Sequence, residues 1–283
     1  MGRAHSRSYL IESSEYEADK EYVLAQLWEL VELLESVTGK KFDQDKLAEA
    51  EAHTNRAMHA WRGILEVNQN KPALYDALAD GVVFLGMINI ARGTKEGADF
   101  FEMALEEFQQ GVRQHYKVIP DEKFRLLFHG VACYPAMRRF QAMFHGWESV
   151  FVTSPYLEFA CGGFSGDFFF DTSKPMESLA DLTLRCNHNA HQAMYYTDQY
   201  IFQREIMKKF NIDGIIFHAV KSCRTVSTSH ANTREFLARH HKIPCLYLES
   251  DHVDPRYFSE AQIKNRVDAF FEALTQKKLY PKE

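Results

Sequence analysis

The N-terminal part of the chain carries apolar side chains at the spacing of α-helices. Residues 17–37 hold an apolar stripe whose members lie three or four positions apart, which predicts one helix. The stripe consists of Val23, Leu24, Leu27, Leu30, Leu33 and Leu34. Gly39 follows at the position where a glycine commonly ends a helix.

Further helices are expected before residue 120. Asp43 or Asp45 can cap a helix that continues to Val67, because aspartate accepts hydrogen bonds from the first free amides of a helix. Two more helical patterns cover residues 73–91 and 94–116. We therefore expect residues 1–120 to form a helical connector segment.

From residue 124 the pattern changes to short apolar runs that alternate with helices. The runs cover residues 125–128, 149–152, 214–217 and 244–248. The helical patterns cover residues 136–145, about 194–210, 229–241 and 259–276. This alternation predicts an α/β domain over residues 121–283, Rossmann- or flavodoxin-like, with a parallel sheet of about four strands covered by helices.

The carboxyl ends of the predicted strands are the expected place for chemistry, because ligands of open parallel sheets bind beyond them. The four following loops all carry reactive or flexible residues. These are His129 and Cys133, then Cys161 with the glycine-rich residues 162–166, then His218, Lys221, Ser222, Cys223 and Arg224, and finally Asp251, His252 and Asp254.

Cys223 is the most distinctive residue of these loops. It comes shortly after a predicted strand and before a helix, between Lys221 and Arg224. Backbone amides, a helix N-terminus and nearby cations favour the thiolate, which is the form that binds iron or acts as a nucleophile. The alternative is a small buried residue, which is a common fate of a free cysteine.

Composition excludes several classes of protein. Charged residues make up 25% of the 283 residues and the net charge is −6, without the basic stripe of a nucleic-acid-binding protein. We expect no membrane span and no secretion signal, hence a cytoplasmic protein. Met1, Gly2 and Ser6 fit the permissive N-myristoylation pattern, but a polar chain start explains them as well. Five scattered cysteines, with no CxxC pair, predict neither a disulfide framework nor a local metal site.

Several of these segments together resemble the 2-hydroxyacyl-CoA dehydratase and benzoyl-CoA reductase family. The C-terminal signature is carried by residues 213–218, Lys221-Ser222-Cys223-Arg224, Ile243-Pro244 and residues 251–259. Residues 38–43 resemble the helical connector of the family. Gly81 and residues 91–94, with 263–266, resemble most the B subunit of benzoyl-CoA reductase.

The resemblance implies a [4Fe-4S] cluster held by three cysteines, one of which corresponds to Cys223. Lys221, Ser222 and Arg224 are candidate cofactor-binding residues beside it; Lys221 and Arg224 either meet the cluster charge or CoA phosphates, or are solvated. The other two ligands belong to an N-terminal domain that this chain is expected to lack; Cys133 and Cys161, or Cys186, are possible replacements. Cys245 is expected in the core. Implied partners are a homologous second subunit in a heterodimer, an ATP-dependent iron–sulfur activator and an acyl-CoA substrate.

Other polar and aromatic residues permit two interpretations. Asp251 and Asp254 either take part in proton transfer or cap a helix. Histidines 129, 188, 218 and 252 are either proton donors or hydrogen-bonded structural residues. Residues 168–170, all phenylalanine, line an acyl pocket or belong to the core.

Three functions follow from the resemblance. The first is a subunit, complete or truncated, of a benzoyl-CoA reductase-like enzyme that reduces an aromatic acyl-CoA by single-electron transfer. The second is a subunit of a 2-hydroxyacyl-CoA dehydratase. The third is a cluster-free relative that serves as a scaffold or assembly partner. The absence of a nucleotide-binding motif agrees with ATP being handled by a separate protein.

Overall fold

The computed structural model describes residues 14–161, 168–195, 206–228 and 230–279. Within these residues the chain forms two compact units. Of the described residues, the first unit contains 14–64, 86–107, 158–161 and 168–192, and the second contains 65–85, 108–157, 193–195, 206–228 and 230–279. The longer helices are α1 (Ser14–Thr38), α2 (Gln44–Val67), α3 (Ala79–Ile90), α4 (Lys95–Arg113), α5 (Met137–His145), α7 (Pro175–Tyr195), α10 (His230–His241) and α11 (Glu260–Leu279).

The second unit is built on a parallel sheet of four strands. The strands are β1 (Phe124–Gly130), β2 (Ser149–Thr153), β3 (Gly214–Val220) and β4 (Cys245–Ser250). Their order is β2-β1-β3-β4, and each neighbouring pair is parallel. This order is that of flavodoxin-like sheets, in which the direction of winding reverses between β1 and β3. The α/β class and the parallel four-stranded sheet predicted from the sequence are confirmed.

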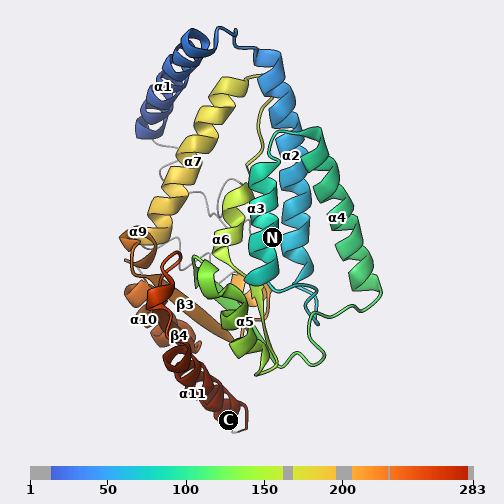
Figure 1. The fold of residues 1–283 in the computed structure, drawn as a ribbon, viewed down its shortest axis with the longest axis vertical. Helices are drawn as coiled ribbons and strands as arrows, with labels where there is room; N and C mark the ends of the chain where they lie inside the picture. Colours follow the sequence, from blue (N-terminus) through green and yellow to red (C-terminus); the bar gives the residue numbers. More distant parts are fainter. Residues whose placement is uncertain (1–13, 162–167, 196–205, 229, 280–283) are drawn as a thin grey trace. The chain divides into compact units, whose positions relative to one another are not determined.

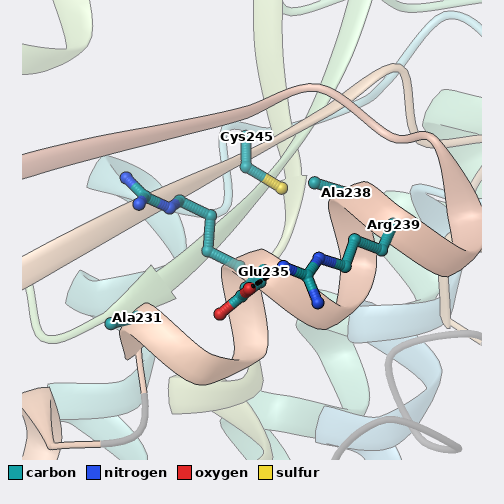
Figure 2. A pocket seen from close by; sticks show the side chains of 6 residues that line it. Ala231, Glu235, Ala238, Arg239 and Cys245 are labelled. Carbon is teal, nitrogen blue, oxygen red and sulfur yellow. Dashed lines mark ion pairs between the residues drawn. The ribbon is translucent and has the colours of Figure 1, made fainter.

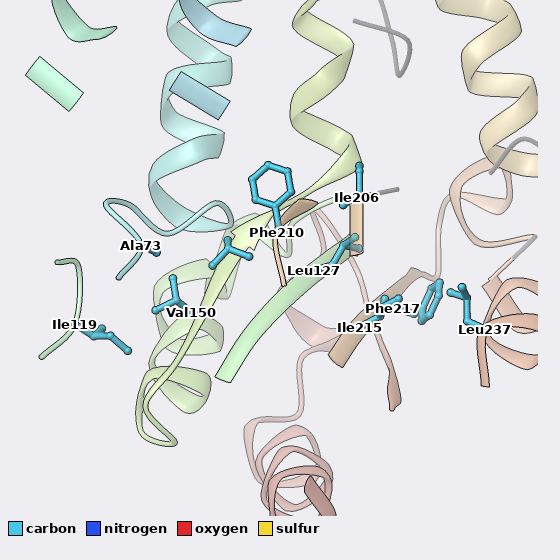
Figure 3. Close-up of a cluster of buried hydrophobic side chains, with 10 residues drawn as sticks. Ala73, Ile119, Leu127, Val150, Ile206, Phe210, Ile215, Phe217 and Leu237 are labelled. Carbon is cyan, nitrogen blue, oxygen red and sulfur yellow. The ribbon is translucent and has the colours of Figure 1, made fainter. Parts of the chain in front are cut away.

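Apolar packing explains why the short runs became strands. All residues of β2 and β3 are buried, as is expected for a parallel sheet with both faces covered. One cluster of buried side chains joins the strands to neighbouring segments (Figure 3). It contains Ala73, Ile119, Leu127, Val150, Val152, Ile206, Phe210, Ile215, Phe217 and Leu237.

A buried arginine fastens the amino end of β1. Arg125 is 2% exposed and pairs with Glu122, which is equally buried. Its guanidinium also donates to the carbonyl oxygens of Asn68, of Asn70 (3.2 Å) and of Phe210 (2.7 Å). Because its hydrogen bonds reach two distant segments, around residues 68–70 and at Phe210, this one side chain connects the start of the sheet to the rest of the unit.

The first unit is helical and is held by polar contacts from α2. Arg56 pairs with Asp99 (2.6 Å) and Glu102 (2.5 Å) of α4, which runs beside α2 in Figure 1. Arg62 donates to the carbonyl oxygens of Cys161 (2.9 Å) and Phe168 (2.5 Å). These contacts fix both α4 and the chain around residue 168 to α2.

Most predicted helices agree with the structure to within a few residues. Asp43, rather than Asp45, caps α2, because its carboxylate accepts from the amides of Asp45 and Lys46. Gly39 has a φ of +67°, as expected at a helix end. Helix α7 was not anticipated from the sequence. The helix predicted over 194–210 lies largely outside the described residues, as do Met1, Gly2 and Ser6.

No helix among the described residues combines the length and the apolarity that crossing a membrane requires.

Candidate functional site

The carboxyl ends of β1, β3 and β4 meet at one edge of the sheet in the second unit. The register aligns Gly130 with His218 and Val220 with Ser250, so the loops that follow these residues start side by side. The reversal of strand order between β1 and β3 lies here, which is where open sheets of this kind bind ligands.

Cys223 lies in a tight turn after β3. It is the N-cap residue of the short helix α9 (Arg224–Ser227), and its amide donates to the carbonyl of Val220 (3.3 Å). The hydroxyl of Ser227 accepts from the amide of Val220 (2.9 Å) and so closes the turn from the other side. The Cys223 side chain is partly exposed and caps no backbone amide. A thiol in this position is accessible to a ligand.

The charged neighbours of Cys223 differ in their contacts. The ammonium group of Lys221 pairs with Glu249 (2.8 Å) and lies 5.3 Å from the centre of the Tyr257 ring. The hydrogen bond to Glu249 raises the pKa of Lys221. Arg224 is exposed. Lys221 is therefore held by its ion pair with Glu249 of β4, while the exposed Arg224 can still bind an anion.

Asp251 organises the backbone beside Cys223. It is 2% exposed, and its carboxylate accepts from the amides of Ser222 (2.9 Å), Val253 (2.9 Å) and Asp254 (3.0 Å). The hydrogen bond from Ser222, followed by those from the two amides in its own loop, holds the pKa of Asp251 well below its usual range. This buried carboxylate ties the loop after β4 to the residue that precedes Cys223.

Asp254 and His252 are more exposed. Asp254 is the N-cap residue of the 3-10 helix at Pro255–Tyr257, and it accepts from the amide of Arg256 (3.0 Å). His252 lies 3.4 Å from the Ser222 hydroxyl, measured from Nδ1. Of the two carboxylates, Asp254 therefore caps a short helix, and Asp251 connects two loops.

His218 links all three strand ends. Its Nδ1 lies 2.5 Å from the carbonyl oxygen of Val131, and its Nε2 lies 2.6 Å from the hydroxyl of Ser250. A carbonyl can only accept, so Nδ1 carries the proton and Nε2 accepts from Ser250. Burial lowers the pKa of His218. The neutral imidazole thus serves as a bridge between loops.

Two further buried imidazoles, those of His129 and His230, form a pair beside β3. Nδ1 of His129 is 3.2 Å from Nε2 of His230, at the start of α10, and both rings contact Phe217. Burial lowers the pKa of His129 to about 4 and, with the adjacent histidines, that of His230 to about 2. Sequence patterns had not singled out His230, because only the fold brings it to His129.

Two of the other cysteines, Cys133 and Cys161, are buried, unlike Cys223. Burial raises the pKa of Cys133 and of Cys245, each to about 12, and also raises that of Cys161. Cys133 and Cys161 are buried, and Cys245 lies partly buried in β4. The side chains of Cys186 and His188, in α7, lie outside the described residues.

These cysteines decide how an iron–sulfur cluster fits the chain. The family resemblance implies three thiolate ligands, and burial keeps a thiol protonated. Within the described parts of the chain no three histidine, cysteine or acidic side chains are placed to share a metal ion. The described residues thus fit one ligand, Cys223, and do not form a complete cluster site.

The consecutive phenylalanines belong to the first unit. Phe168 and Phe170 are buried and pack edge to face at 5.0 Å, whereas Phe169 is 49% exposed beneath the guanidinium of Arg62 (4.3 Å). Two of the three side chains are thus packed into this unit, and Phe169 alone offers an apolar surface to solvent.

Comparison with known proteins identifies the family. The sequence profile of the family described as 2-hydroxyglutaryl-CoA dehydratase, D-component, matches residues 2–274. The B subunit of benzoyl-CoA reductase of Thauera aromatica is 30% identical over 92% of this chain and 61% of its own length. The alpha subunit of (R)-2-hydroxyglutaryl-CoA dehydratase of Acidaminococcus fermentans is 26% identical over 91% of this chain and 51% of its own length. The alpha subunit of (R)-phenyllactyl-CoA dehydratase of Clostridium sporogenes is also 26% identical, over 91% of this chain and 60% of its own length.

The chain therefore spans between 51% and 61% of the length of these relatives. All three are enzyme subunits whose names refer to CoA thioesters. Because the family profile covers nearly the whole chain, the resemblance predicted from the sequence is confirmed, and this chain belongs to the 2-hydroxyglutaryl-CoA dehydratase D-component family.

Proposed function

We propose that this chain is a subunit of an enzyme that transforms an acyl-CoA thioester, with its reactive site at the carboxyl edge of the sheet around Cys223. The observation that carries the proposal is the partly exposed thiol of Cys223 at the point where the strand order reverses. Family membership supports the class of substrate, since the relatives named above are acyl-CoA reductase or dehydratase subunits.

In this proposal Cys223 supplies one thiolate to a [4Fe-4S] cluster, and the remaining ligands come from outside the described residues. When bound, such a cluster supplies single electrons at low potential. The chain's own contribution is to orient the thiol, because Asp251 fixes the amide of Ser222 and Ser227 closes the turn behind it. Arg224 offers a positive charge to the cluster or to a CoA phosphate.

The preferred reaction is reduction of an aromatic acyl-CoA, as in benzoyl-CoA reductase, because that relative shows 30% identity against 26% or less for the dehydratase subunits. Dehydration of a 2-hydroxyacyl-CoA is the second candidate, favoured by the number of dehydratase relatives. The complex with its homologous second subunit and an ATP-dependent activator is to be assayed with benzoyl-CoA and with a 2-hydroxyacyl-CoA. Loss of water without ring reduction would reject the reductase.

The cluster ligand is tested by purification under anaerobic conditions together with the homologous subunit. We expect iron and acid-labile sulfide in the wild type, and their loss in Cys223→Ser. Cys245→Ser is the matched control, because Cys245 lies within a strand and is partly buried. Equal iron content in both variants would reject Cys223 as a ligand.

A cluster-free scaffold is the remaining alternative, and it is favoured by the incomplete ligand set among the described residues. A complex that contains this chain, yet carries no iron and shows no turnover with either thioester, would support it. Iron that depends on Cys223 would reject it.

A further inference from the structure

The strand β4 lies at the open edge of the sheet. Among the described residues it pairs with β3 only. The amide of Ile215 donates to the carbonyl of Pro244 (2.9 Å), and that of Lys221 donates to the carbonyl of Ser250 (3.0 Å). Because backbone groups alternate along a strand, those of Cys245, Tyr247 and Glu249 point away from β3. Such an unpaired row is a template for another strand.

A cleft of about 520 Å³ lies beside the first residue of β4 (Figure 2). It is lined by Ala231, Arg234, Glu235, Ala238, Arg239 and Cys245. In Figure 2 the sulfur of Cys245 points toward Ala238 of α10. The cleft is roomy because two alanines, one at each end of its helical wall, leave space that longer side chains would fill.

The charges of this cleft do not cancel. Arg239 pairs with Glu235 (2.5 Å), whereas Arg234 stacks on Tyr247 at 5.8 Å and forms no ion pair with a carboxylate of the described residues. The stacking also shows that the side chains of Cys245 and Tyr247 lie on the face covered by α10. Glu249 shares this face by alternation; one of its carboxylate oxygens pairs with Lys221 of the same copy (2.8 Å), and its side chain is 48% exposed, which leaves its other oxygen open to a second cation.

These features are complementary to one another. In an antiparallel pair of two β4 strands centred on Tyr247, Tyr247 faces its equivalent and Cys245 faces Glu249 of the other copy. All of these residues have outward backbone groups, so each pair can exchange both hydrogen bonds. The same register brings Glu249 of one copy to Arg234 of the other. A two-fold axis closes this contact, so no open-ended assembly follows.

We propose that this chain associates with a second copy of itself through antiparallel pairing of the two β4 strands centred on Tyr247, with Glu249 of each copy meeting Arg234 of the other. The contact lies on the second unit alone. It does not depend on the proposed enzymatic function, because it uses neither Cys223 nor a bound cofactor.

The backbone contact is tested by Tyr247→Pro, with Tyr247→Phe as the matched control. Proline removes the outward amide hydrogen at the centre of the pair and is tolerated in edge strands, whereas phenylalanine keeps the amide. Sedimentation of the wild type over a range of concentrations should show a monomer–dimer equilibrium. We expect Tyr247→Pro to weaken it at least about tenfold, the loss of a central hydrogen-bonded pair, and Tyr247→Phe to preserve it.

A charge exchange and a cross-link test the register without relying on proline. Arg234→Glu and Glu249→Arg should each weaken the dimer, and combining them should restore it. Tyr247→Cys should form a disulfide between copies, because Cα atoms in such a pair lie about 5.5 Å apart. The control is Val253→Cys, an exposed position outside the strand; it should cross-link little.

Several outcomes would overturn the proposal. One is a wild type that stays monomeric at every concentration, and another is a dimer unchanged by Tyr247→Pro. A monomeric chain whose Tyr247→Pro variant loses binding to the homologous subunit would assign this edge to that subunit instead. Failure of the double charge exchange to restore association, with no cross-link from Tyr247→Cys, would reject the register.

Discussion

At the scale of single residues, buried polar side chains define the strand-end loops. Asp251 accepts three backbone amides while almost fully buried, and His218 is held between a carbonyl and a hydroxyl. Such groups are stable because each desolvated atom finds a partner. The chemistry expected of Cys223 therefore depends on neighbours that need not themselves touch a substrate.

Asp251→Asn should destabilise the protein by about 2 kcal/mol, because an amide nitrogen replaces one of the charged acceptors. The folded pKa of Asp251 lies below that of an unfolded aspartate, about 3.9. Its stabilisation is therefore complete above that pH and is lost as the pH falls further. Urea unfolding of both proteins between pH 7 and pH 3 measures this. A difference in free energy of unfolding between the two proteins that stays constant from pH 7 to pH 3 would contradict this prediction.

The imidazole pair should make the protein sensitive to mild acid. The folded pKa values of His129 and His230 are about 4 and about 2, below the unfolded value of about 6.5. Below pH 6.5 the unfolded chain binds more protons than the folded chain. The free energy of unfolding therefore decreases as the pH is lowered, by up to about 1.4 kcal/mol per pH unit for each histidine. We expect His230→Leu to flatten this dependence between pH 7 and pH 5, measured by urea unfolding. His240→Gln, at an exposed position, should leave the slope unchanged.

At the scale of elements, two strands approach closely at the site. Gly130 ends β1 with a φ of +128°, and a Cβ atom there would meet the carbonyl oxygen of His218 at 2.4 Å. A backbone carbonyl group cannot move aside as the end of a flexible side chain can. The close approach of β1 and β3 at their carboxyl ends therefore requires glycine at this position.

Gly130→Ala should destabilise the fold by about 3 kcal/mol, through backbone strain and overpacking. Gly86→Ala is the control, because a Cβ atom there meets nothing within 4 Å in α3. It should stabilise the protein by up to about 1 kcal/mol. Thermal and chemical unfolding distinguish the two; equal effects would refute the steric argument.

The connection made by Arg125 belongs to the same scale. Arg125→Met leaves Glu122 buried without its cation, which should lower the free energy of unfolding by about 3–5 kcal/mol. Adding Glu122→Gln should recover part of that loss. Lys123→Met is the control: it breaks an exposed ion pair with Glu148 and should change the free energy of unfolding by less than about 1 kcal/mol. A double-mutant cycle by urea unfolding measures the coupling, and additive effects would contradict it.

At the scale of the whole molecule, the chain spans about half to three fifths of the length of its named relatives, and the described residues do not place three ligands around one metal ion. We expect this chain, purified alone and reconstituted with iron and sulfide, to hold well under one cluster per chain. Co-purification with the homologous second subunit proposed above should raise the iron content if that subunit completes the ligand set. Full loading of the isolated chain would show that its own residues suffice. The measurements are iron and sulfide analysis with absorption spectra.

The sequence alone determined the elements whose patterns are local. The stripes of α1 and α2, the four apolar runs that became strands, and the end of α1 at Gly39 could all be read from local spacing, because a helix places residues three and four apart on one face and a strand covered on both faces is apolar throughout. The family could also be recognised, since its motifs are contiguous. The division of the chain near residue 120 and the roles of Lys221, Ser222, Cys223 and Arg224 stay predictions.

Only the tertiary structure decided the strand order, the burial of Cys133 and Cys161, and the pairing of His129 with His230 or of Asp251 with Ser222. These partners lie far apart in sequence, and the sequence pattern around a buried polar residue does not show which distant atom satisfies it. Helix α7 escaped prediction for a related reason, because its buried residues Met176, Ala180 and Leu184 form a narrow stripe that only packing distinguishes.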